Sequence, residues 1–294
     1  MTNVTDGVAG LERVVGFRPR AAVTHVVFDF DGTLSLVRAG WPEIMLGMFV
    51  EMLPRRAGET EAELRPRLLA DLLRMNGRQT IHQMIQFAGE VADRGGAAEA
   101  PEWYLAEFTR RLSVCIRERS EAIATGRRPA DDFVVHGGRA LLEELRGRGF
   151  KLYLLSGTLE RFVRQEAELL GLTEFFGPRL FGGHEDHTKF SKQAVFARIL
   201  REEGISGERL LSFGDGPVEI QNTKELGGMA VAVASDELNN GSGRMHPEKR
   251  RQLLAAGADA VIADYREPLG LLAGLLGAER VCQTRKAGGK CGDK

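Results

Sequence analysis

The sequence is poor in cysteine, in net charge and in long apolar runs. Its three cysteines are too few for a disulfide framework, and their odd number is typical of a reducing compartment, so we expect a cytoplasmic protein. Lys and Arg total 40 against 41 Asp and Glu, which gives no electrostatic reason to expect nucleic acid or a membrane surface as a partner. No apolar run approaches the roughly 18 residues of a membrane span, and the start of the chain does not have the pattern of a signal peptide.

Lysine is also scarce, with eight Lys against 32 Arg, and none precedes Lys151. The first half of the chain therefore supplies no lysine chemistry. In the segment HTKFSKQAVFARIL, Lys192 stands where a helix is expected to begin, a position that is unfavourable for a cation unless an anion lies nearby. Lys192 is thus a candidate site residue, and Lys189 in the same segment is the alternative.

The remaining composition is that of a globular protein, with 43% hydrophobic residues, and 294 residues suffice for one large or two modest domains. Residues 1–20 are expected to be a polar lead-in with weak periodicity. Residues 21–29 form an apolar, β-branched run that predicts a strand buried on both faces of a parallel sheet. From about residue 41 to residue 128 the apolar residues recur at helical spacing, with no convincing strand.

After His136, short apolar runs alternate with amphipathic segments. We expect strands over 151–156, 179–181, 210–213, 229–234 and 260–263. We expect helices over 139–148, 159–170, 192–203, 220–226, 247–256 and 268–276. Strands that alternate with helices predict an α/β fold with a doubly wound parallel sheet. The predicted organisation is a core domain over 1–36 and 134–280, an inserted all-helical domain over 37–133, and a disordered tail over 281–294.

Polar groups follow four of the expected strands, at the sheet edge where ligands of open parallel sheets bind. The first is Asp29-Phe30-Asp31-Gly32-Thr33, in which two acids two residues apart can both point their carboxylates into one crevice. Two carboxyls that meet there repel, so one can stay ionised as a nucleophile while the other keeps a proton as a general acid. The second is Ser156-Gly157-Thr158, whose hydroxyl and main-chain N–H groups can bind an anion.

The third group is the lysine pair described above, and the fourth is Gly214-Asp215-Gly216-Pro217-Val218-Glu219. An acid at a strand end suits a metal ligand, and Glu219 lies one helical turn further along. Taken in this order, the four groups resemble the motifs of the haloacid dehalogenase (HAD) superfamily of phosphotransferases. The resemblance covers roughly residues 21–280.

This resemblance implies a role for each matching residue. Asp29 resembles the nucleophile, and Asp31 the general acid and base. Thr33 resembles the residue that supports this turn, and Thr33, Ser156 and Gly157 are candidate phosphate-binding residues. Lys192, rather than Lys189, resembles the lysine that neutralises the nucleophile and the phosphate.

The resemblance also implies a Mg²⁺ site. The ligands would be Asp29, the main-chain carbonyl of Asp31, and Asp215. Glu219 departs from the pattern, because many relatives have Asp at that position, so its direct contact with the metal is open. Since Cys282 and Cys291 lie in a Gly- and Lys-rich tail with no second pair, we expect no zinc site there.

The helical insertion stands where this superfamily places a cap that closes over small substrates and carries specificity. Candidate specificity residues are Arg38, Arg78 and Thr80. The expected enzyme is a Mg²⁺-dependent phosphatase of a small phosphorylated metabolite, either a sugar phosphate or a phosphorylated small acid, acting through an aspartyl-phosphate. A phosphomutase or a non-catalytic member that binds a phosphorylated ligand are the alternatives. Oligomeric state is open.

Other chemistries fit the sequence less well. A dehalogenase needs no acid at the position of Asp31. A phosphonoacetaldehyde-type hydrolase needs a cap lysine, and no Lys precedes Lys151. A nucleotide-binding kinase is disfavoured because neither a G-x-x-x-x-G-K-[ST] loop nor a strand-linked G-x-G-x-x-G is present.

Overall fold

A computed structural model describes residues 4–6 and 10–278, and the predicted tail lies outside the described residues. Their sheet has eight strands in the order β1-β2-β8-β7-β6-β3-β4-β5. The six parallel strands are β3 (His25–Phe28), β4 (Lys151–Leu159), β5 (Leu180–Gly183), β6 (Leu210–Gly214), β7 (Met229–Val233) and β8 (Ala260–Ile262). Every residue of β3 is buried, as expected for a central strand covered on both faces.

The prediction that residues 1–20 form a polar lead-in is wrong. Its residues form two strands, β1 (Val4–Asp6) and β2 (Leu11–Val14), which pair with each other and with β8 in antiparallel fashion. Only Leu11 of β2 is buried, so this edge strand lacks the apolar alternation by which strands are recognised. The sheet is therefore mixed at this edge and parallel elsewhere.

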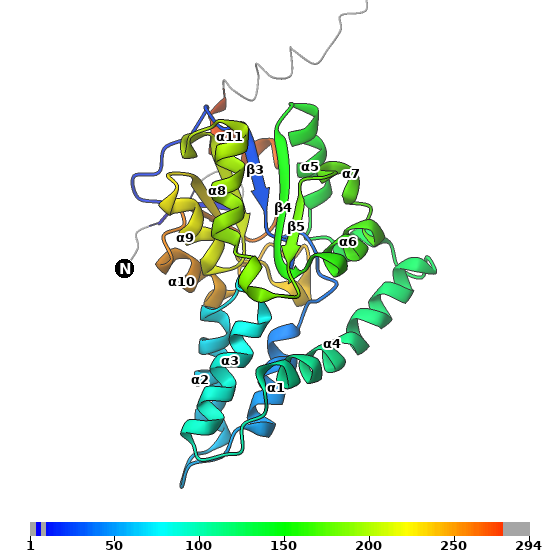
Figure 1. The fold of residues 1–294 in the computed structure, drawn as a ribbon. Helices are drawn as coiled ribbons and strands as arrows, with labels where there is room; N and C mark the ends of the chain where they lie inside the picture. Colours follow the sequence, from blue (N-terminus) through cyan, green and yellow to red (C-terminus); the bar gives the residue numbers. More distant parts are fainter. Residues whose placement is uncertain (1–3, 7–9, 279–294) are drawn as a thin grey trace, which may run out of the picture.

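Helices cover both faces of the sheet (Figure 1). One face carries α8 (Lys192–Glu203), α9 (Pro217–Glu225) and α10 (Pro247–Ala255). The other carries α5 (Gly138–Gly147), α6 (Glu160–Leu169), α7 (Thr173–Phe176) and α11 (Pro268–Leu276). The predicted doubly wound α/β class is confirmed.

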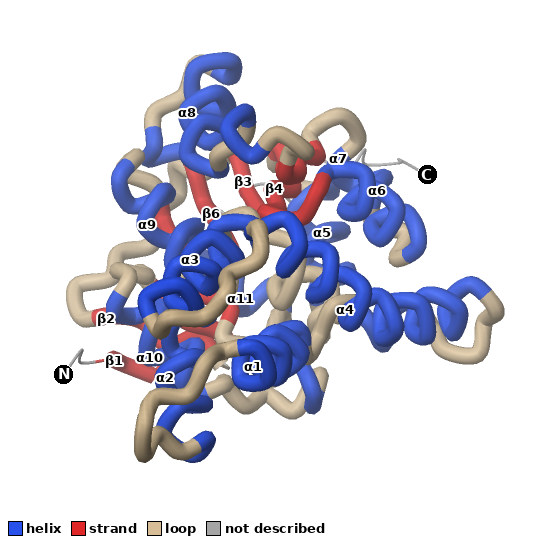
Figure 2. Tube along the Cα trace, turned by 60° about the horizontal axis from the view of Figure 1, so that its bottom comes forward, coloured by secondary structure: helices blue, strands red, loops and turns tan. Residues whose placement is uncertain are grey.

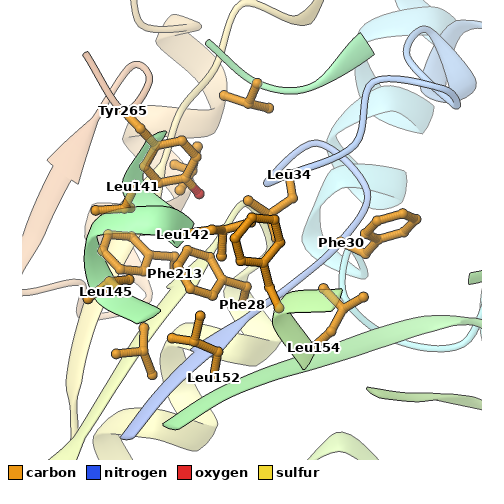
Figure 3. Close-up of a cluster of buried hydrophobic side chains, with 14 of the residues drawn as sticks. Phe28, Phe30, Leu34, Leu141, Leu142, Leu145, Leu152, Leu154, Phe213 and Tyr265 are labelled. Carbon is orange, nitrogen blue, oxygen red and sulfur yellow. The ribbon is translucent and has the colours of Figure 1, made fainter. Parts of the chain in front are cut away.

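The larger core lies under the second helix layer. Figure 3 shows Phe28 of β3 beside Phe213 of β6, with leucines of α5 and β4 around them. The two phenylalanine rings stack with centroids 5.0 Å apart, and Tyr265 meets both rings edge-on. Tyr265 also donates a hydrogen bond to the carbonyl of Thr33 at 3.0 Å, so this core fixes the turn that follows β3.

Four helices are inserted between β3 and α5, and we call these helices and the loops that join them the cap. They are α1 (Trp41–Met52), α2 (Glu61–Arg74), α3 (Thr80–Asp93) and α4 (Pro101–Ala124). They enclose a separate core in which Phe49 stacks on Phe87 with centroids 3.8 Å apart. The long helix α4 runs from the other cap helices past α6 (Figure 2) and contacts it. No helix in the described residues is both long and apolar enough to cross a bilayer.

Candidate active site

Three neighbouring parallel strands bring distant motifs to one edge of the sheet. Because β3 lies between β6 and β4, the carboxyl ends of the three strands meet. Asp29 continues β3 by donating its main-chain N–H to the carbonyl of Phe213 at 2.9 Å. Ser156 lies near the end of β4, which is longer than predicted and pairs irregularly with β5 after Leu155. Asp215 directly follows β6.

Lys192 reaches this edge from the start of α8. Ser191 caps that helix by accepting a hydrogen bond from the N–H of Ala194 at 3.1 Å. The Lys192 Nζ then lies 2.6 Å from Asp29 Oδ1 and also contacts Glu219 Oε1. All three charged side chains are buried. The alternative, Lys189, lies on the surface and pairs with Asp186 at 3.3 Å.

Burial changes the proton affinity of Asp29. Removal from water raises the pKa of its carboxyl to about 6, although Lys192 opposes the shift and the charges of Asp215 and Asp31 add to it. The Asp29 carboxylate is therefore ionised at neutral pH but held at a cost in free energy. A buried anion of this kind, facing a cleft, is a candidate nucleophile.

Asp31 is oriented by hydroxyl groups of β4. Thr158 Oγ1 donates to Asp31 Oδ2 at 2.8 Å, and Ser156 Oγ donates to the same oxygen at 3.3 Å. Ser156 Oγ also accepts from the N–H of Thr158 at 3.0 Å, so the three groups form one network. The structure thus brings Asp31 and Ser156 together at the cleft. The part played by the Thr158 hydroxyl was not predicted.

Arg38 lies on the other side of Asp31 and is held by an acid that the sequence did not reveal. The Arg38 guanidinium binds Glu166 of α6 through two nitrogens, at 3.0 and 2.6 Å, and its Nε lies 3.5 Å from Asp31 Oδ1. Burial raises the pKa of Glu166 to about 7, against the opposing charge of Arg38. Arg38 is thus fixed beside Asp31 by a bidentate pair.

A second buried lysine was missed. Lys249 of α10 donates to Asp215 Oδ2 at 2.8 Å and to Glu237 Oε1 at 2.5 Å. Burial disfavours its charge, yet the carboxylates of Asp215 and Glu237 outweigh burial and raise the pKa of Lys249. Lys249 is the third residue of its helix, so the argument that singled out Lys192 at a helix start also applied to it.

The cap loop between α2 and α3 inserts between the motifs of the core. Asn76 Nδ2 donates to both the main-chain oxygen and Oδ1 of Asp215, at 3.2 Å each. A Cβ on Gly77, which has a φ of 92°, would lie 2.4 and 2.5 Å from the two carboxylate oxygens of Glu219. The Arg78 carbonyl also lies close to Gly157, since a Cβ on Gly157 would lie 2.8 Å from the carbonyl oxygen. The loop therefore packs against both sides of the site.

These contacts predict a large effect of adding one methyl group. Gly77→Ala would place a carbon against Glu219 and would also strain a backbone with positive φ. We expect the cap loop to move out of the site and any activity there to fall at least about tenfold. Gly58→Ala is the matched control, because Gly58 has a φ of 78° but no atom within 4 Å of its Cβ position. Equal activity of the two variants would contradict this account of the loop.

A cleft of about 60 Å³ opens among these groups, room for about four waters. Its described lining includes the predicted residues Asp29, Asp31, Ser156, Gly157, Lys192, Arg38, Arg78 and Thr80. Thr33 is not part of this lining. Its side chain is completely buried, and its Oγ1 has no hydrogen-bond partner among the described residues. Asp215 and Glu219 lie behind the cleft, where they contact the two lysines.

The acidic groups offer oxygen ligands for a hard cation. A Cβ on Gly32 would lie 2.2 Å from Asp215 Oδ2, so the main chain of the Asp29–Thr33 turn lies directly against Asp215. The buried Oε2 of Glu219 has no hydrogen-bond partner among the described residues and is a free acceptor. Within residues 4–6 and 10–278, however, no three acidic, His or Cys side chains form a metal-binding group by themselves. A main-chain carbonyl oxygen can complete the ligand set, since Mg²⁺ accepts carbonyl and water ligands as well as carboxylates.

Several known proteins are similar to this chain. A family model described as haloacid dehalogenase-like hydrolase matches residues 23–227. A 5′-nucleotidase of Pseudomonas aeruginosa is 26% identical over 209 residues, which are 71% of this chain and 81% of that protein.

Solved structures show the same fold. A haloacid dehalogenase-like protein of Agrobacterium tumefaciens has a TM-score of 0.57 at 15% identity, covering 85% of this chain and 98% of its own. A predicted phosphoglycolate phosphatase of Haemophilus somnus has a TM-score of 0.55 at 14% identity, with the same coverage of 85% and 98%.

Proposed function

The chain belongs to the haloacid dehalogenase-like hydrolases and is a hydrolase of phosphoric monoesters, and we propose that it releases phosphate from a small-molecule substrate through an aspartyl-phosphate on Asp29. The observation that carries this proposal is the buried Asp29 carboxylate, held 2.6 Å from Lys192 at a cleft that Asp31 also lines. This arrangement pairs an ionised nucleophile with a second carboxyl two residues away.

In the first step, an Asp29 oxygen attacks phosphorus and the bond from phosphorus to the substrate oxygen breaks. Asp31 donates a proton to that oxygen, so the alcohol leaves neutral. Lys192 balances negative charge beside Asp29, and Ser156 and Gly157, which line the cleft, would bind phosphoryl oxygens.

In the second step, Asp31 removes a proton from water, which attacks phosphorus and breaks the bond to Asp29. Inorganic phosphate leaves and both carboxyls return to their first state. Thr158 and Ser156 donate hydrogen bonds to one oxygen of Asp31. The other oxygen, Oδ1, has no hydrogen-bond partner among the described residues, and the Arg38 Nε lies 3.5 Å from it.

Asp29, the Asp31 carbonyl and Asp215 would hold Mg²⁺, with Glu219 as a nearby acceptor. When bound, this ion supplies positive charge that polarises a phosphoryl oxygen. The chain's own contribution is to keep these oxygens buried and close together through Lys192 and Lys249.

The direct test is phosphate release from p-nitrophenyl phosphate in the presence of Mg²⁺. A panel of phosphorylated metabolites, including a nucleoside 5′-monophosphate because of the P. aeruginosa relative, would then rank substrates. Turnover that yields an isomeric sugar phosphate without free phosphate would instead identify a phosphomutase. Absence of phosphate from every compound would contradict the proposal.

Asp31→Asn tests the assignment of the acid and base. The amide keeps the hydrogen-bond acceptor for Thr158 but cannot donate or accept the transferred proton. We expect kcat for p-nitrophenyl phosphate to fall about 10²- to 10⁴-fold. Thr158→Val is the companion variant, since it removes the orienting hydroxyl and leaves the acid, and we expect a smaller loss. Wild-type kcat in Asp31→Asn would refute the role of this carboxyl.

A further inference from the structure

A second, much larger cavity adjoins the cleft. It has a volume of about 570 Å³ and lies between the cap helix α4, the start of α3 and the core helix α6. We call it the groove. The groove and the cleft share six lining residues, namely Arg38, Thr80, Phe108, Leu112, Gly157 and Thr158. The two spaces are therefore adjacent, and the groove is the nearest large space for the rest of a molecule whose phosphate lies beside Asp29.

The groove is much too large for the leaving group of a phosphorylated two- or three-carbon acid. Pockets that bury drug-sized ligands have volumes of roughly 300–1,000 Å³, and the groove falls within that range. The cleft, at about 60 Å³, has room for the phosphoryl group alone. Most of the volume at this site, which is that of the groove, is thus available to the leaving group of the substrate.

Apolar side chains from both walls dominate the groove. They come from α3, α4, the end of β4 and α6, and are Ile81, Leu105, Phe108, Leu112, Ile116, Leu159, Phe162 and Leu169. Hydroxyl and amide groups such as those of Thr109 and Gln165 are interspersed among them. Such a lining favours the binding of an apolar ligand, because binding removes apolar surface of the ligand from water.

The charges of the groove disfavour an anion. Of the described residues that line it, only Arg38 carries a permanent positive charge, and Glu166 already binds that guanidinium through two nitrogens. Two further acids, Glu102 and Glu185, also line the groove, and Glu185 pairs with Arg161. Arg38 and Arg161 are thus both already paired with an acid, so a second carboxylate or phosphate on the substrate would have to compete with Glu166 or Glu185 for them.

We propose that the groove binds the leaving group of the substrate, and that this group is an uncharged, mainly apolar alcohol larger than a simple sugar. This inference rests on the proposed function, because it takes the reacting phosphate to lie beside Asp29. Of the substrates predicted from the sequence, the inference disfavours the phosphorylated small acids.

A series of n-alkyl phosphates from ethyl to octyl tests the size and polarity of the leaving group. We expect kcat/KM to rise roughly threefold for each methylene group, and at least about 100-fold over the series. For octyl phosphate with a terminal carboxylate, we expect kcat/KM to be at least about tenfold lower than for octyl phosphate. A flat series, or a preference for the carboxylated compound, would overturn the inference.

Two adjacent residues of α4 provide matched variants. Ser113 lines the groove, whereas Val114 is exposed and lies outside the lining. Ser113→Trp fills the groove, so we expect the ratio of kcat/KM for octyl over ethyl phosphate to fall at least about tenfold. Val114→Trp adds the same ring and should keep the wild-type ratio. If Ser113→Trp does not fold by circular dichroism, Thr109→Trp takes its place.

Two further measurements separate other outcomes. If no phosphate is released from any compound, the proposed function fails, and calorimetry with octylphosphonate and ethylphosphonate still tests the groove. Binding of the octyl compound at least about 100-fold tighter would support the inference, and equal binding would overturn it. Light scattering tests whether a second copy of the chain occupies the groove. A dimer that dissociates in the Ser113→Trp variant would also overturn the inference.

Discussion

Asp29→Asn is expected to abolish phosphate release and, at the same time, to make the metal-free protein more stable above about pH 6. The first effect follows because an amide nitrogen or oxygen cannot form the aspartyl-phosphate. The second follows from burial, which raises the pKa of Asp29 to about 6. The nucleophile is thus an anion that the fold accommodates at a cost in free energy.

The dependence on pH has a definite sign. A carboxyl whose pKa is raised in the folded state favours folding when protonated, and this contribution is lost as the pH rises from the ordinary pKa of 3.8 to about 6. Asn resembles the protonated form at every pH. The two proteins should therefore be equally stable below about pH 4 and differ by about 3 kcal/mol above pH 6.

Urea denaturation in EDTA between pH 4 and pH 8 measures this difference. Asp264→Asn is the matched control, because burial there is outweighed by hydrogen bonds from Arg266, which lower the pKa of Asp264. That variant should lose stability at neutral pH, the opposite of Asp29→Asn. Turnover by Asp29→Asn, or a stability difference independent of pH, would refute the assignment of Asp29 as a strained, ionised nucleophile.

Much of the fold could be predicted because its signals are local. The buried strand before Asp29 is a continuous apolar run, and the helix 192–203 has the predicted bounds. Asp29 and Asp215 lie together because parallel strands end at one edge, and Lys192 reaches that edge from the start of α8. The edge hairpin of β1 and β2 was missed because only one residue of β2 is buried.

The parts of the site that were missed depend on long-range packing. Nothing near Asn76 in the sequence indicates that its amide donates to Asp215, 139 residues away. Likewise, the pairing of Arg38 with Glu166 depends on how α6 packs beside the first motif. Local patterns place such residues on helices or loops but do not give the partner that each one faces.

Lys249 is the missed residue whose replacement should have the largest effect on stability. Lys249→Met removes a buried cation and leaves Asp215 and Glu237 without it. We expect the free energy of unfolding in EDTA to fall by about 3–5 kcal/mol, the usual cost of breaking a buried ion pair on one side. Lys224→Met is the control, because Lys224 forms a more exposed pair with Asp259 and its loss should cost about 1 kcal/mol or less.

Mg²⁺ should then stabilise Lys249→Met more than it stabilises the wild type. In the wild type, Lys249 occupies one oxygen of Asp215 and Asn76 the other, so a bound ion has to share this carboxylate with a resident cation. The variant presents Asp215 without that competitor, and binding to the folded state alone raises stability. Denaturation midpoints measured across a Mg²⁺ series give this difference without reference to turnover. Equal stabilisation of the two proteins would remove Asp215 from the proposed ligands, whereas a larger gain in the variant would identify Lys249 as the internal cation that Mg²⁺ displaces.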